Sequence, residues 1–375
     1  MTATPSDLLA RRRSRRAGPP GRVVVVGATV GQGHEGAARE LARRLRRTGV
    51  WVKVHDYVDA LPGPVARTVK DLYAPSVRYT PRLFDGLFRG LEHPGVLRSV
   101  TEWACGLAAD RVEAWTGGAD VVVSTYPLAS RTLGELRRAG RLPATTVSYL
   151  TDPAAHAFWC HPEIDLHLTV TSATALDARR YGVPARASGP LCAPRFGDTA
   201  RRAAVRGELE IPLDAPFVLL SAGSLGMGDV PETVEAITRH PRAHAVVLCA
   251  RNTGLRRALA SRPRVVALGW RDDVPDLMAA ADVLVHNAGG LSFTEALVAG
   301  LPAVTYRPIP GHGRANAAVL AAAGIAAWPR TPDELAAEIE RLHGRPRAQA
   351  HPWPPDADPA EVVRGLLPAA LENAA

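Results

Sequence analysis

The sequence predicts an α/β protein built from two doubly wound domains that face each other across a central cleft. Its first element, Arg22–Val26, is a continuous β-branched run typical of a buried parallel strand, and a glycine-rich turn, a helix and a second strand follow it. A linker-like segment, Gly189–Pro194, separates this unit from a second series of alternating strands and helices. Loops at the carboxyl ends of parallel strands line the ligand site in such folds, so we look for function there.

The composition is that of an ordinary globular protein with about two domains. The chain of 375 residues is 46% hydrophobic and 22% charged, with a formal net charge of +8. Only Lys53 and Lys70 are lysines, so arginine supplies the positive charge, although a GC-rich genome would explain the same bias. The charge favours an anionic partner, such as a nucleotide or a phospholipid surface. Aromatic residues make up only 5% and form no RNA-binding motif, which argues against nucleic acid.

Neither the cysteines nor the hydrophobic runs indicate an extracellular or membrane-spanning protein. The four cysteines have no C-x-x-C spacing, so we expect no disulfide framework, no zinc site and a reducing cytoplasm. No apolar run approaches the ~20 residues that a membrane-spanning helix needs. Residues 1–21 contain the basic run Arg11–Arg16 and are expected to form a disordered tail, which either touches acidic lipid headgroups or has no role.

The first domain is expected to span residues 22–190, and His34 is its candidate catalytic base. His34 lies where the glycine-rich turn becomes a helix, which we expect from about Glu35 to Thr48. An imidazole there can reach the cleft, and a helix N-terminus keeps it neutral and therefore able to accept a proton. The alternative is a surface histidine in a loop.

The same turn also matches a dinucleotide-binding fingerprint. Gly31–Gly36 reads G-x-G-x-x-G, and Asp56 lies about where such folds place the acid that binds the ribose. The preceding strand ends at Val26, however, so the match begins too late along the chain. We therefore treat the fingerprint as a weak indication.

Residues 62–116 combine aromatic and basic side chains with prolines that predict several short helices. Basic residues mixed with interfacial aromatics suit a surface that lies on a bilayer or admits a lipid. The candidate residues for this acceptor and membrane surface are Tyr79, Arg82, Phe84, Phe88 and Arg89. The alternative is a set of amphipathic helices that pack on the sheet and expose solvated outer faces.

Two further strands of the first domain, Ala119–Ser124 and Thr145–Leu150, end in polar residues on the crevice side. Asp152 follows the second of these strands and is a candidate catalytic residue that would orient His34. The other candidates for the crevice are His156, Trp159 and His161. Their spacing fits no zinc signature, so we expect no metal. A last strand is expected at Leu166–Thr169.

The second domain is expected to span residues 191–345 and to bind a nucleotide. Its strands are expected at Phe217–Leu220, Ala245–Cys249, Val265–Leu268, Val283–Val285 and Pro302–Tyr306. Gly223 and Ser224 lie in a glycine-rich turn that could meet a phosphate or the acceptor. The backbone of Gly269 and Trp270 could pair with the edge of a nucleobase. Residues 346–375 are expected to form a loop and a short helix that returns to the first domain.

The segment His286–Pro302 is the centre of the second domain. It opens with a glycine pair, Gly289-Gly290, and then reads as a helix start with Ser292 as the candidate N-cap. A helix N-terminus can hold a phosphate with its unpaired N–H groups, and Glu295 can accept hydrogen bonds from ribose hydroxyls. The alternative is that Ser292 and Glu295 form only a capping box.

Four motifs give the chain a resemblance to a known family. They are GATVGQGHEGAA at 27–38, DVVVSTYPLAS at 120–130, LTDPAAHAFWCHPEIDLHLTVT at 150–171 and ADVLVHNAGGLSFTEALVAGLP at 281–302. The chain resembles the bacterial and plant diacylglycerol glycosyltransferases over about residues 22–342, and more distantly the N-acetylglucosaminyltransferase of peptidoglycan lipid intermediates. The resemblance implies a GT-B fold, made of two Rossmann-like domains, and a UDP-sugar donor.

The resemblance also implies roles for single residues. His34 matches the proposed base for the acceptor hydroxyl, the segment Gly289–Ser292, with Leu291, matches the diphosphate site, and Glu295 matches the ribose ligand. Further residues at positions of donor contact are Arg251, Gly269, Trp270, His312 and Asn316. After Pro310-Gly311 the family usually has Gln-Glu for the donor sugar, whereas this chain has His312-Gly313.

We therefore predict an inverting glycosyltransferase that moves a hexose from a UDP-sugar to a lipid, diacylglycerol, without a metal or other cofactor. The enzyme would be cytoplasmic and peripheral on the inner face of the cell membrane, held by an anionic surface. One alternative is a soluble small-molecule acceptor, and another is an inactive GT-B protein, motivated by His312-Gly313. A dinucleotide-dependent oxidoreductase comes last, because HNAGGLSFTEA has no place in that class.

Overall fold

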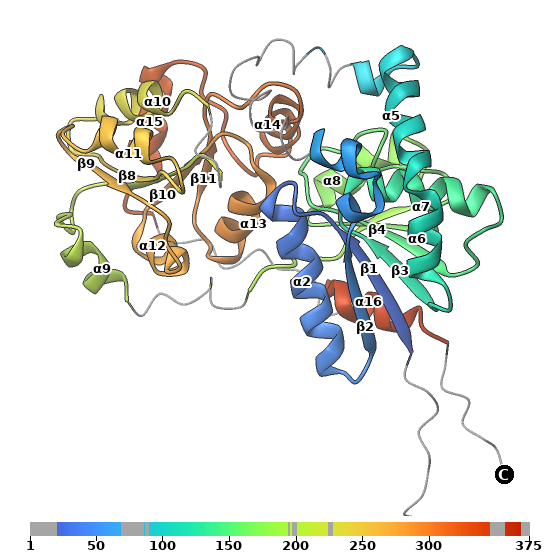
Figure 1. Cartoon of the computed structure of the whole chain (residues 1–375). Coiled ribbons are helices and arrows are strands. Elements are labelled where there is room, and N and C mark those ends of the chain that lie inside the picture. Colours follow the sequence, from blue (N-terminus) through green and yellow to red (C-terminus); the bar gives the residue numbers. More distant parts are fainter. Residues whose placement is uncertain are drawn as a thin grey trace, which may run out of the picture.

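The computed structural model describes residues 21–68, 86, 90–193, 196, 201–223, 228–345 and 357–368. These residues form two parallel sheets, each covered by helices on both faces (Figure 1). The prediction of two doubly wound α/β units is therefore confirmed. Six predicted site residues lie outside the described residues: Ser224 and the five expected to meet the acceptor and the membrane, which are Tyr79, Arg82, Phe84, Phe88 and Arg89.

The N-terminal sheet has the strand order β2-β1-β3-β4-β5-β6, and all neighbours are parallel. Its strands are β1 (Arg22–Gly27), β2 (Trp51–Asp56), β3 (Val121–Ser124), β4 (Thr145–Leu150), β5 (Leu166–Thr169) and β6 (Ala185–Ala187). The sequence predicted all of these except β6, which has only three residues and lacks an apolar run.

The valine run of β1 explains why helices cover both faces of this sheet. Successive side chains of a strand point to opposite faces. Val23 and Val25 pack in one buried cluster with α2 (Gln32–Arg47) and α16 (Pro359–Gly365), whereas Val24 and Val26 pack in another with α6 and α7. The other elements of this domain are η1 (Tyr57–Ala60), α5 (Val96–Leu107), α6 (Ala109–Thr116), α7 (Pro127–Arg138) and α8 (Ser172–Arg179).

The C-terminal sheet has the strand order β11-β10-β7-β8-β9, again parallel throughout. Its strands are β7 (Phe217–Ser221), β8 (His244–Leu248), β9 (Val265–Leu268), β10 (Val283–His286) and β11 (Ala303–Thr305). Its helices are α9 (Arg202–Glu208), α10 (Val230–Thr238), α11 (Thr253–Leu259), α12 (Val274–Ala280), α13 (Gly290–Val298), α14 (His312–Ala322) and α15 (Pro332–Leu342). All five strands were predicted within two residues.

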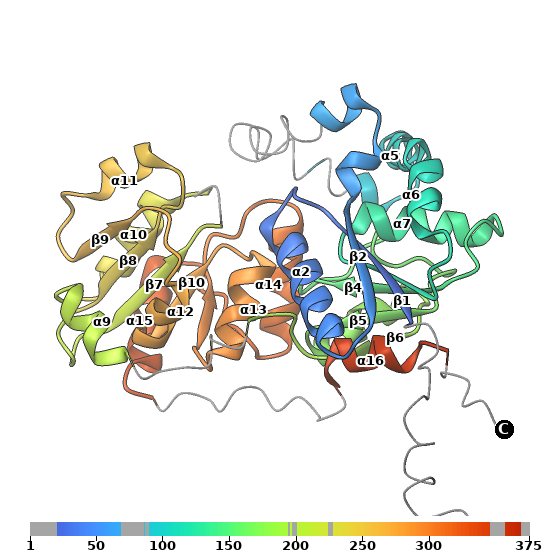
Figure 2. The ribbon, with the colours of Figure 1, turned by 60° about the horizontal axis from the view of Figure 1, so that its bottom comes forward.

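Arg44 on α2 ties together the two places where the chain passes between the domains. Its guanidinium donates to the carbonyl oxygens of Pro190 and Cys192, at 3.1 and 2.9 Å, and forms an ion pair with Asp358 at 3.1 Å. Asp358 also caps α16 by accepting a hydrogen bond from the N–H of Ala360. The last helix thus packs against α2 beneath the N-terminal sheet (Figure 2).

Each sheet has one point where the strand order reverses, and these two points face each other. In the N-terminal sheet the point lies between β1 and β3, and in the C-terminal sheet between β7 and β10. Ligands of doubly wound sheets bind in the crevice at such switch points. Helices α2 and α13, which follow β1 and β10, lie side by side at the interface in both views (Figures 1 and 2). Within the described ranges, no helix combines the length and the hydropathy that a membrane span requires.

Candidate active site

A cavity of about 920 Å³ lies between the two domains at the switch points. The N-terminal domain lines it with residues 29–36 of the first turn and with Thr151 and Asp152 after β4. The C-terminal domain contributes segments 221–223, 269–272, 286–287 and 289–292 from the ends of its strands. The cavity is therefore bounded by the carboxyl ends of parallel strands from both sheets, where sequence reasoning expected a ligand.

His34 lies inside the first turn of α2, which begins at Gln32 rather than at Glu35. Its Nδ1 lies 3.0 Å from the carbonyl oxygen of Thr125 and 2.9 Å from Oγ1 of Thr151. A carbonyl oxygen can only accept a hydrogen bond, so Nδ1 carries the proton and Nε2 keeps its lone pair. The imidazole is therefore oriented as a base.

Gly31 allows the close turn that brings His34 to this position. Its φ is +94°, and a Cβ atom there would lie 3.0 Å from Cδ2 of His34. Glycine alone adopts such a conformation without strain. Burial lowers the pKa of His34 below 6.5, although Asp152 and the carbonyl of Thr125 partly oppose this shift. The imidazole is thus neutral at physiological pH.

Asp152 was expected to orient His34, but no hydrogen bond between the two is described in the structure. Its carboxylate accepts a hydrogen bond from Nε1 of Trp159 at 3.1 Å, while the contacts described for Nδ1 of His34 come from Thr125 and Thr151. Burial opposes ionisation of Asp152, but nearby imidazoles, His34 first, outweigh it and lower the pKa of this carboxyl. Asp152 therefore acts on His34 through its charge.

The other candidates from this crevice segment are not cavity residues. Trp159 is fully buried and packs under β4, and His161 is buried against α7, where a Cβ atom on Gly134 would overlap its ring. Asp56, the acid of the weak dinucleotide fingerprint, instead accepts hydrogen bonds from Thr29 and from the N–H of Val58. These roles are structural and remove support for a dinucleotide site.

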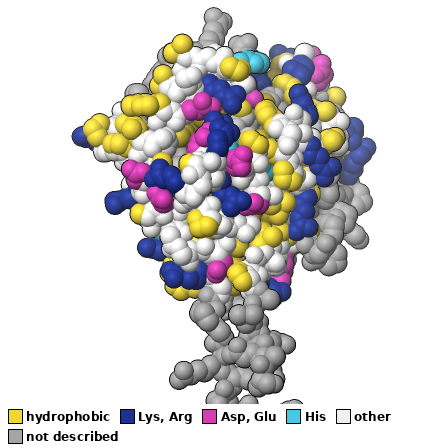
Figure 3. Space-filling view, turned by 90° about the vertical axis from the view of Figure 1, so that its right-hand side faces the viewer, with side chains coloured by type: hydrophobic (Ala, Val, Ile, Leu, Met, Phe, Trp, Pro, Cys, Tyr) yellow, Lys and Arg dark blue, Asp and Glu magenta, His cyan; other side chains and the backbone are white. Residues whose placement is uncertain are grey.

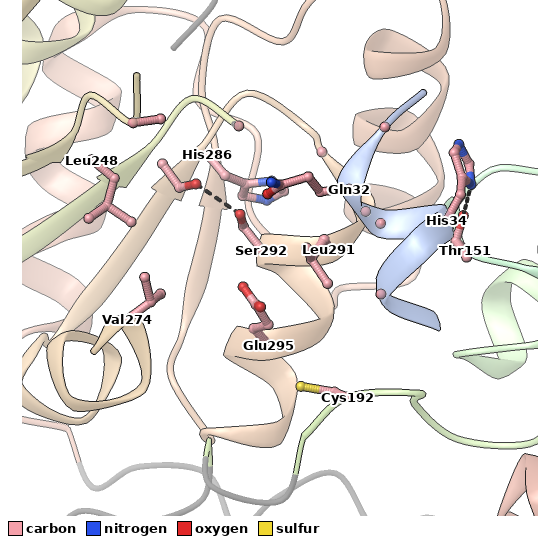
Figure 4. Close-up of a pocket in the computed structure, with 18 of the residues that line it drawn as sticks. Gln32, His34, Thr151, Cys192, Leu248, Val274, His286, Leu291, Ser292 and Glu295 are labelled. Carbon is pink, nitrogen blue, oxygen red and sulfur yellow. Dashed lines mark hydrogen bonds between the residues drawn. The ribbon is translucent and has the colours of Figure 1, made fainter. Parts of the chain in front are cut away.

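The helix that follows β10 begins at Gly290, two residues before the predicted N-cap Ser292. The N-cap is Gly289, and no side chain caps the helix. The hydroxyl of Ser292 instead lies 2.8 Å from that of Ser221 at the end of β7 (Figure 4). The capping-box alternative is therefore wrong, and the first N–H groups of α13 are not occupied by a capping side chain.

The turn before α13 is held in a strained conformation. Ala288 has a φ of +77°, which costs about 1–3 kcal/mol for a residue with a side chain. Its N–H donates to Nδ1 of His286, and Nε2 of His286 lies 3.1 Å from Oγ1 of Thr305. The buried His286 thus fixes the path of the chain into the helix.

The remaining candidates for donor binding divide into two groups. Gly223, Gly269, Trp270, Leu291, Glu295 and His312 line the cavity together with Gly289, Gly290 and Ser292. Arg251 does not line it but stacks on the ring of Trp270, with its guanidinium carbon 5.0 Å from the ring centroid. Figure 4 shows Glu295 on α13 directed into the cavity, one turn after Ser292.

Asn316, expected to contact the donor, is instead fully buried between the domains. Its Oδ1 accepts from the N–H of Ala154 at 2.9 Å, and its Nδ2 donates to the carbonyl of Ala288 at 3.0 Å. Both ends of the amide are bonded to protein and Asn316 is not among the residues that line the cavity, so its contact with the donor stays a prediction. Asn316 joins the N-terminal domain to the turn before α13.

Sequence reasoning missed Thr125 and Thr151, which contact His34, and Gln32, which lines the cavity. The two threonines directly follow the predicted strands β3 and β4, and Gln32 lies in the glycine-rich turn. His34, the partner of both threonines, comes from a distant part of the chain, which a pattern of neighbouring residues does not reveal. Across the part of the chain that the structure describes, no cluster of three His, Cys, Asp or Glu side chains has metal-binding geometry.

Comparisons with known proteins agree with this geometry. Residues 34–188 match the family model of monogalactosyldiacylglycerol (MGDG) synthase, and residues 219–345 match that of the glycosyl transferases group 1. The processive diacylglycerol beta-glucosyltransferases of Bacillus mycoides (strain KBAB4) and Bacillus cereus (strain B4264) are both 23% identical to the chain. Each alignment spans 333 residues, or 86% of this chain and 85% of the relative.

Solved structures show the same fold. The glycosyltransferase of kitacinnamycin is 20% identical, with a TM-score of 0.56, over 92% of this chain and 94% of that one. MurG of Acinetobacter baumannii is 18% identical, with a TM-score of 0.54, over 92% and 95%. With both family models and the two facing doubly wound domains, these matches identify the chain as a GT-B glycosyltransferase that is similar to the diacylglycerol glycosyltransferases.

Proposed function

We propose that this enzyme transfers a hexose from a UDP-sugar to a hydroxyl of diacylglycerol, with inversion at the anomeric carbon. The observation that carries the proposal is that a neutral imidazole and an uncapped helix start face one cavity from opposite domains. The first can remove a proton from an acceptor, and the second can hold a diphosphate. The curated relatives are named for transfer to diacylglycerol, and a structural neighbour, HepE of Anabaena, was solved with UDP and glucose.

The donor would lie mainly on the C-terminal domain. Its diphosphate would meet the first N–H groups of α13, from Gly290 to Ser292, where the helix dipole favours negative charge. The ribose hydroxyls would donate to Glu295, and the base would meet the turn at Gly269 and Trp270. This arrangement assigns no metal to the diphosphate, because backbone donors supply the positive potential.

The reaction would proceed by a single displacement. Nε2 of His34 would take the proton of the acceptor hydroxyl as its oxygen attacks the anomeric carbon, and the bond to UDP would break on the opposite side. Donors at the start of α13 would stabilise the charge that develops on the leaving diphosphate. Asp152 would stabilise the imidazolium that forms, since its charge already acts on His34.

Glu295 offers a test of the ribose site. We expect Glu295→Gln to weaken UDP binding about tenfold, because a hydrogen bond to a charged group contributes about 1.5–3 kcal/mol. Isothermal titration calorimetry with UDP and with 2′,3′-dideoxyuridine diphosphate would measure this, and the variant should bind the second ligand as the wild type does. Glu232→Gln on the exposed side of α10 is the matched control. If Glu295→Gln lost the same affinity for both ligands, Glu295 would not contact the ribose hydroxyls.

The acceptor would arrive from a membrane surface next to α5. Four apolar residues of this helix are exposed to solvent: Val96 by 82%, Val100 by 53%, Trp103 by 64% and Leu107 by 36%. Their spacing places them on one face of the helix. Figure 3 views the end of the molecule that carries α5 to α7, where basic and acidic side chains are interspersed with hydrophobic ones. Among the described residues, the feature that supports membrane contact is therefore the row of exposed apolar side chains on α5, and not a uniform basic patch.

A variant of this row tests the membrane contact. We expect V100S/W103S to lower co-sedimentation with vesicles containing anionic lipid at least about tenfold, because burying each such side chain contributes about 1.5–3 kcal/mol. Leu213→Ser removes a residue that is 74% exposed on the C-terminal domain and should change nothing. Undiminished binding by the double variant would exclude α5 as the contact.

The activity itself is tested by sugar transfer from labelled UDP-glucose, UDP-galactose and UDP-N-acetylglucosamine into extracted membrane lipid. Label in glycolipid from one donor would support the proposal and identify the sugar. The sequence leaves the sugar open, because His312 and Gly313 stand where the family usually has Gln-Glu. Label that enters only soluble acceptors would contradict the lipid acceptor. UDP binding without transfer to any acceptor would indicate a protein that has lost catalysis.

A further inference from the structure

The loop of residues 151–154 contacts the candidate base and the C-terminal domain at the same time. At one end, Oγ1 of Thr151 lies 2.9 Å from Nδ1 of His34 (Figure 4). At the other end, the N–H of Ala154 donates to Oδ1 of Asn316 at 2.9 Å. Asn316 in turn donates to the carbonyl of Ala288, in the turn that leads into α13. One short loop therefore links the imidazole to the segment that would hold the diphosphate.

Between these hydrogen bonds, the backbone of Gly290 at the start of α13 lies directly against the backbone of Thr151. A Cβ atom on Gly290 would lie 2.3 Å from the carbonyl oxygen of Thr151. No side chain fits between the two segments, so the start of α13 rests on the loop itself. The absence of a side chain at residue 290 is thus required by the domain contact.

The loop is also anchored within its own domain. The hydroxyl of Thr174, on α8, donates to the carbonyl of Pro153 at 2.7 Å, and the N–H of Ala155 donates to Oδ2 of Asp177 at 2.9 Å. These bonds hold Pro153 and Ala155 to α8 on the side of the N-terminal domain. Thr151, which contacts His34, lies at the other end of the loop, before the two residues that α8 holds.

We infer that Thr151 is a positioning residue for His34, and that loop 151–154 makes the orientation of this base depend on closure of the C-terminal domain. The inference rests on the proposed function, in which His34 is the base. Thr125 holds Nδ1 through its carbonyl, which directly follows β3 in the N-terminal domain. Thr151 adds a second contact to the same Nδ1 atom. Thr151 belongs to the loop that lies against Gly290 and bonds to Asn316. A donor that holds the two domains together would thereby keep this second contact to the imidazole in place.

Kinetics of Thr151 variants test the positioning. Thr151→Val keeps the shape and removes the hydroxyl, so we expect kcat to fall about tenfold while KM for the UDP-sugar changes less than about twofold. Thr151→Ser should restore kcat, because it returns the hydroxyl. The control is Thr116→Val, which removes a buried hydroxyl that bonds only within α6. An unchanged kcat in Thr151→Val, or no rescue by serine, would overturn the role.

A spectroscopic measurement tests the coupling without relying on activity. Nitrogen-15 spectra of labelled histidines report which ring nitrogen carries the proton, and the signal of His34 is identified by its loss in His34→Gln. We expect UDP to alter the His34 signal in the wild type and to alter it much less in Asn316→Ala, with UDP binding measured in both.

The outcomes separate this inference from the proposed function. If bound UDP did not change the nitrogen-15 signal of His34 in the wild type, the coupling of His34 to the C-terminal domain would be refuted, even if sugar transfer is observed. A signal that responds to UDP in the wild type and not in Asn316→Ala would support the coupling, even if no lipid acceptor is found.

Discussion

Replacing His34 by alanine is expected to lower the rate of sugar transfer by about 10²- to 10⁴-fold, the usual contribution of a general base. Affinity for UDP should change less than about twofold, because the nucleotide would lie on the other domain. Transfer of label and calorimetric titration with UDP measure the two quantities on the same protein. His93→Ala, at an exposed position, is the control. A variant that keeps full activity would remove His34 from the mechanism.

The pH dependence of the same reaction gives an independent view of this base. Burial lowers the pKa of His34 below its ordinary value of 6.5, and the carboxylate of Asp152 opposes the shift only in part. A base with a lowered pKa loses its activity only when the pH falls below that pKa. The acid limb of the profile of kcat/KM should therefore lie below pH 6.5 and should be absent from the residual activity of His34→Ala.

Gly290→Ala is expected to reduce transfer about 100-fold, although it adds a single methyl group. That methyl would lie 2.3 Å from the carbonyl oxygen of Thr151, and a backbone atom cannot turn away as a side chain can. The domains must separate to admit it, and a misplacement of about 1 Å is enough to cost a factor of about 10² in rate. The transfer assay and the radius of gyration from X-ray scattering, with and without UDP, would follow both effects.

The control for this substitution is Gly207→Ala, which places the same methyl group on α9 where no atom lies within 4 Å. It should leave transfer and scattering unchanged. If Gly290→Ala retained full activity with an unchanged radius of gyration, the contact between α13 and loop 151–154 would not be needed for catalysis.

Local patterns predicted the strands well because each buried parallel strand is a short, continuous apolar run. The valines of β1 are apolar on both faces since both faces are covered, and this signal needs no knowledge of the partners. The glycine-rich turn after β1 likewise predicted the place of His34, because only a tight turn brings that residue to the cleft. β6 was missed because it is short and half-exposed, and such strands form through their neighbours.

Hydrogen-bond partners from distant segments explain where the site in the structure differs from the site that the sequence predicted. Ser292 was expected to cap α13, but it meets Ser221 from another strand. Asn316 was expected to meet the donor, but it bonds to Ala154 of the other domain. In both cases the residue type was read correctly as a hydrogen-bonding group, and the position of its partner could not be read from the neighbouring sequence.

By itself, the sequence determined the two doubly wound domains, the places of His34 and of the segment Gly289–Glu295, and the likeness to glycosyltransferases. These follow from the order of apolar runs and glycines along the chain. Only the tertiary structure decided which atoms hold the imidazole, that α13 begins without a capping side chain, and that loop 151–154 joins the base to the opposite domain. The physical reason is that strand and turn propensities act between neighbours, whereas a site between two domains is made of contacts that exist only after both sheets have formed.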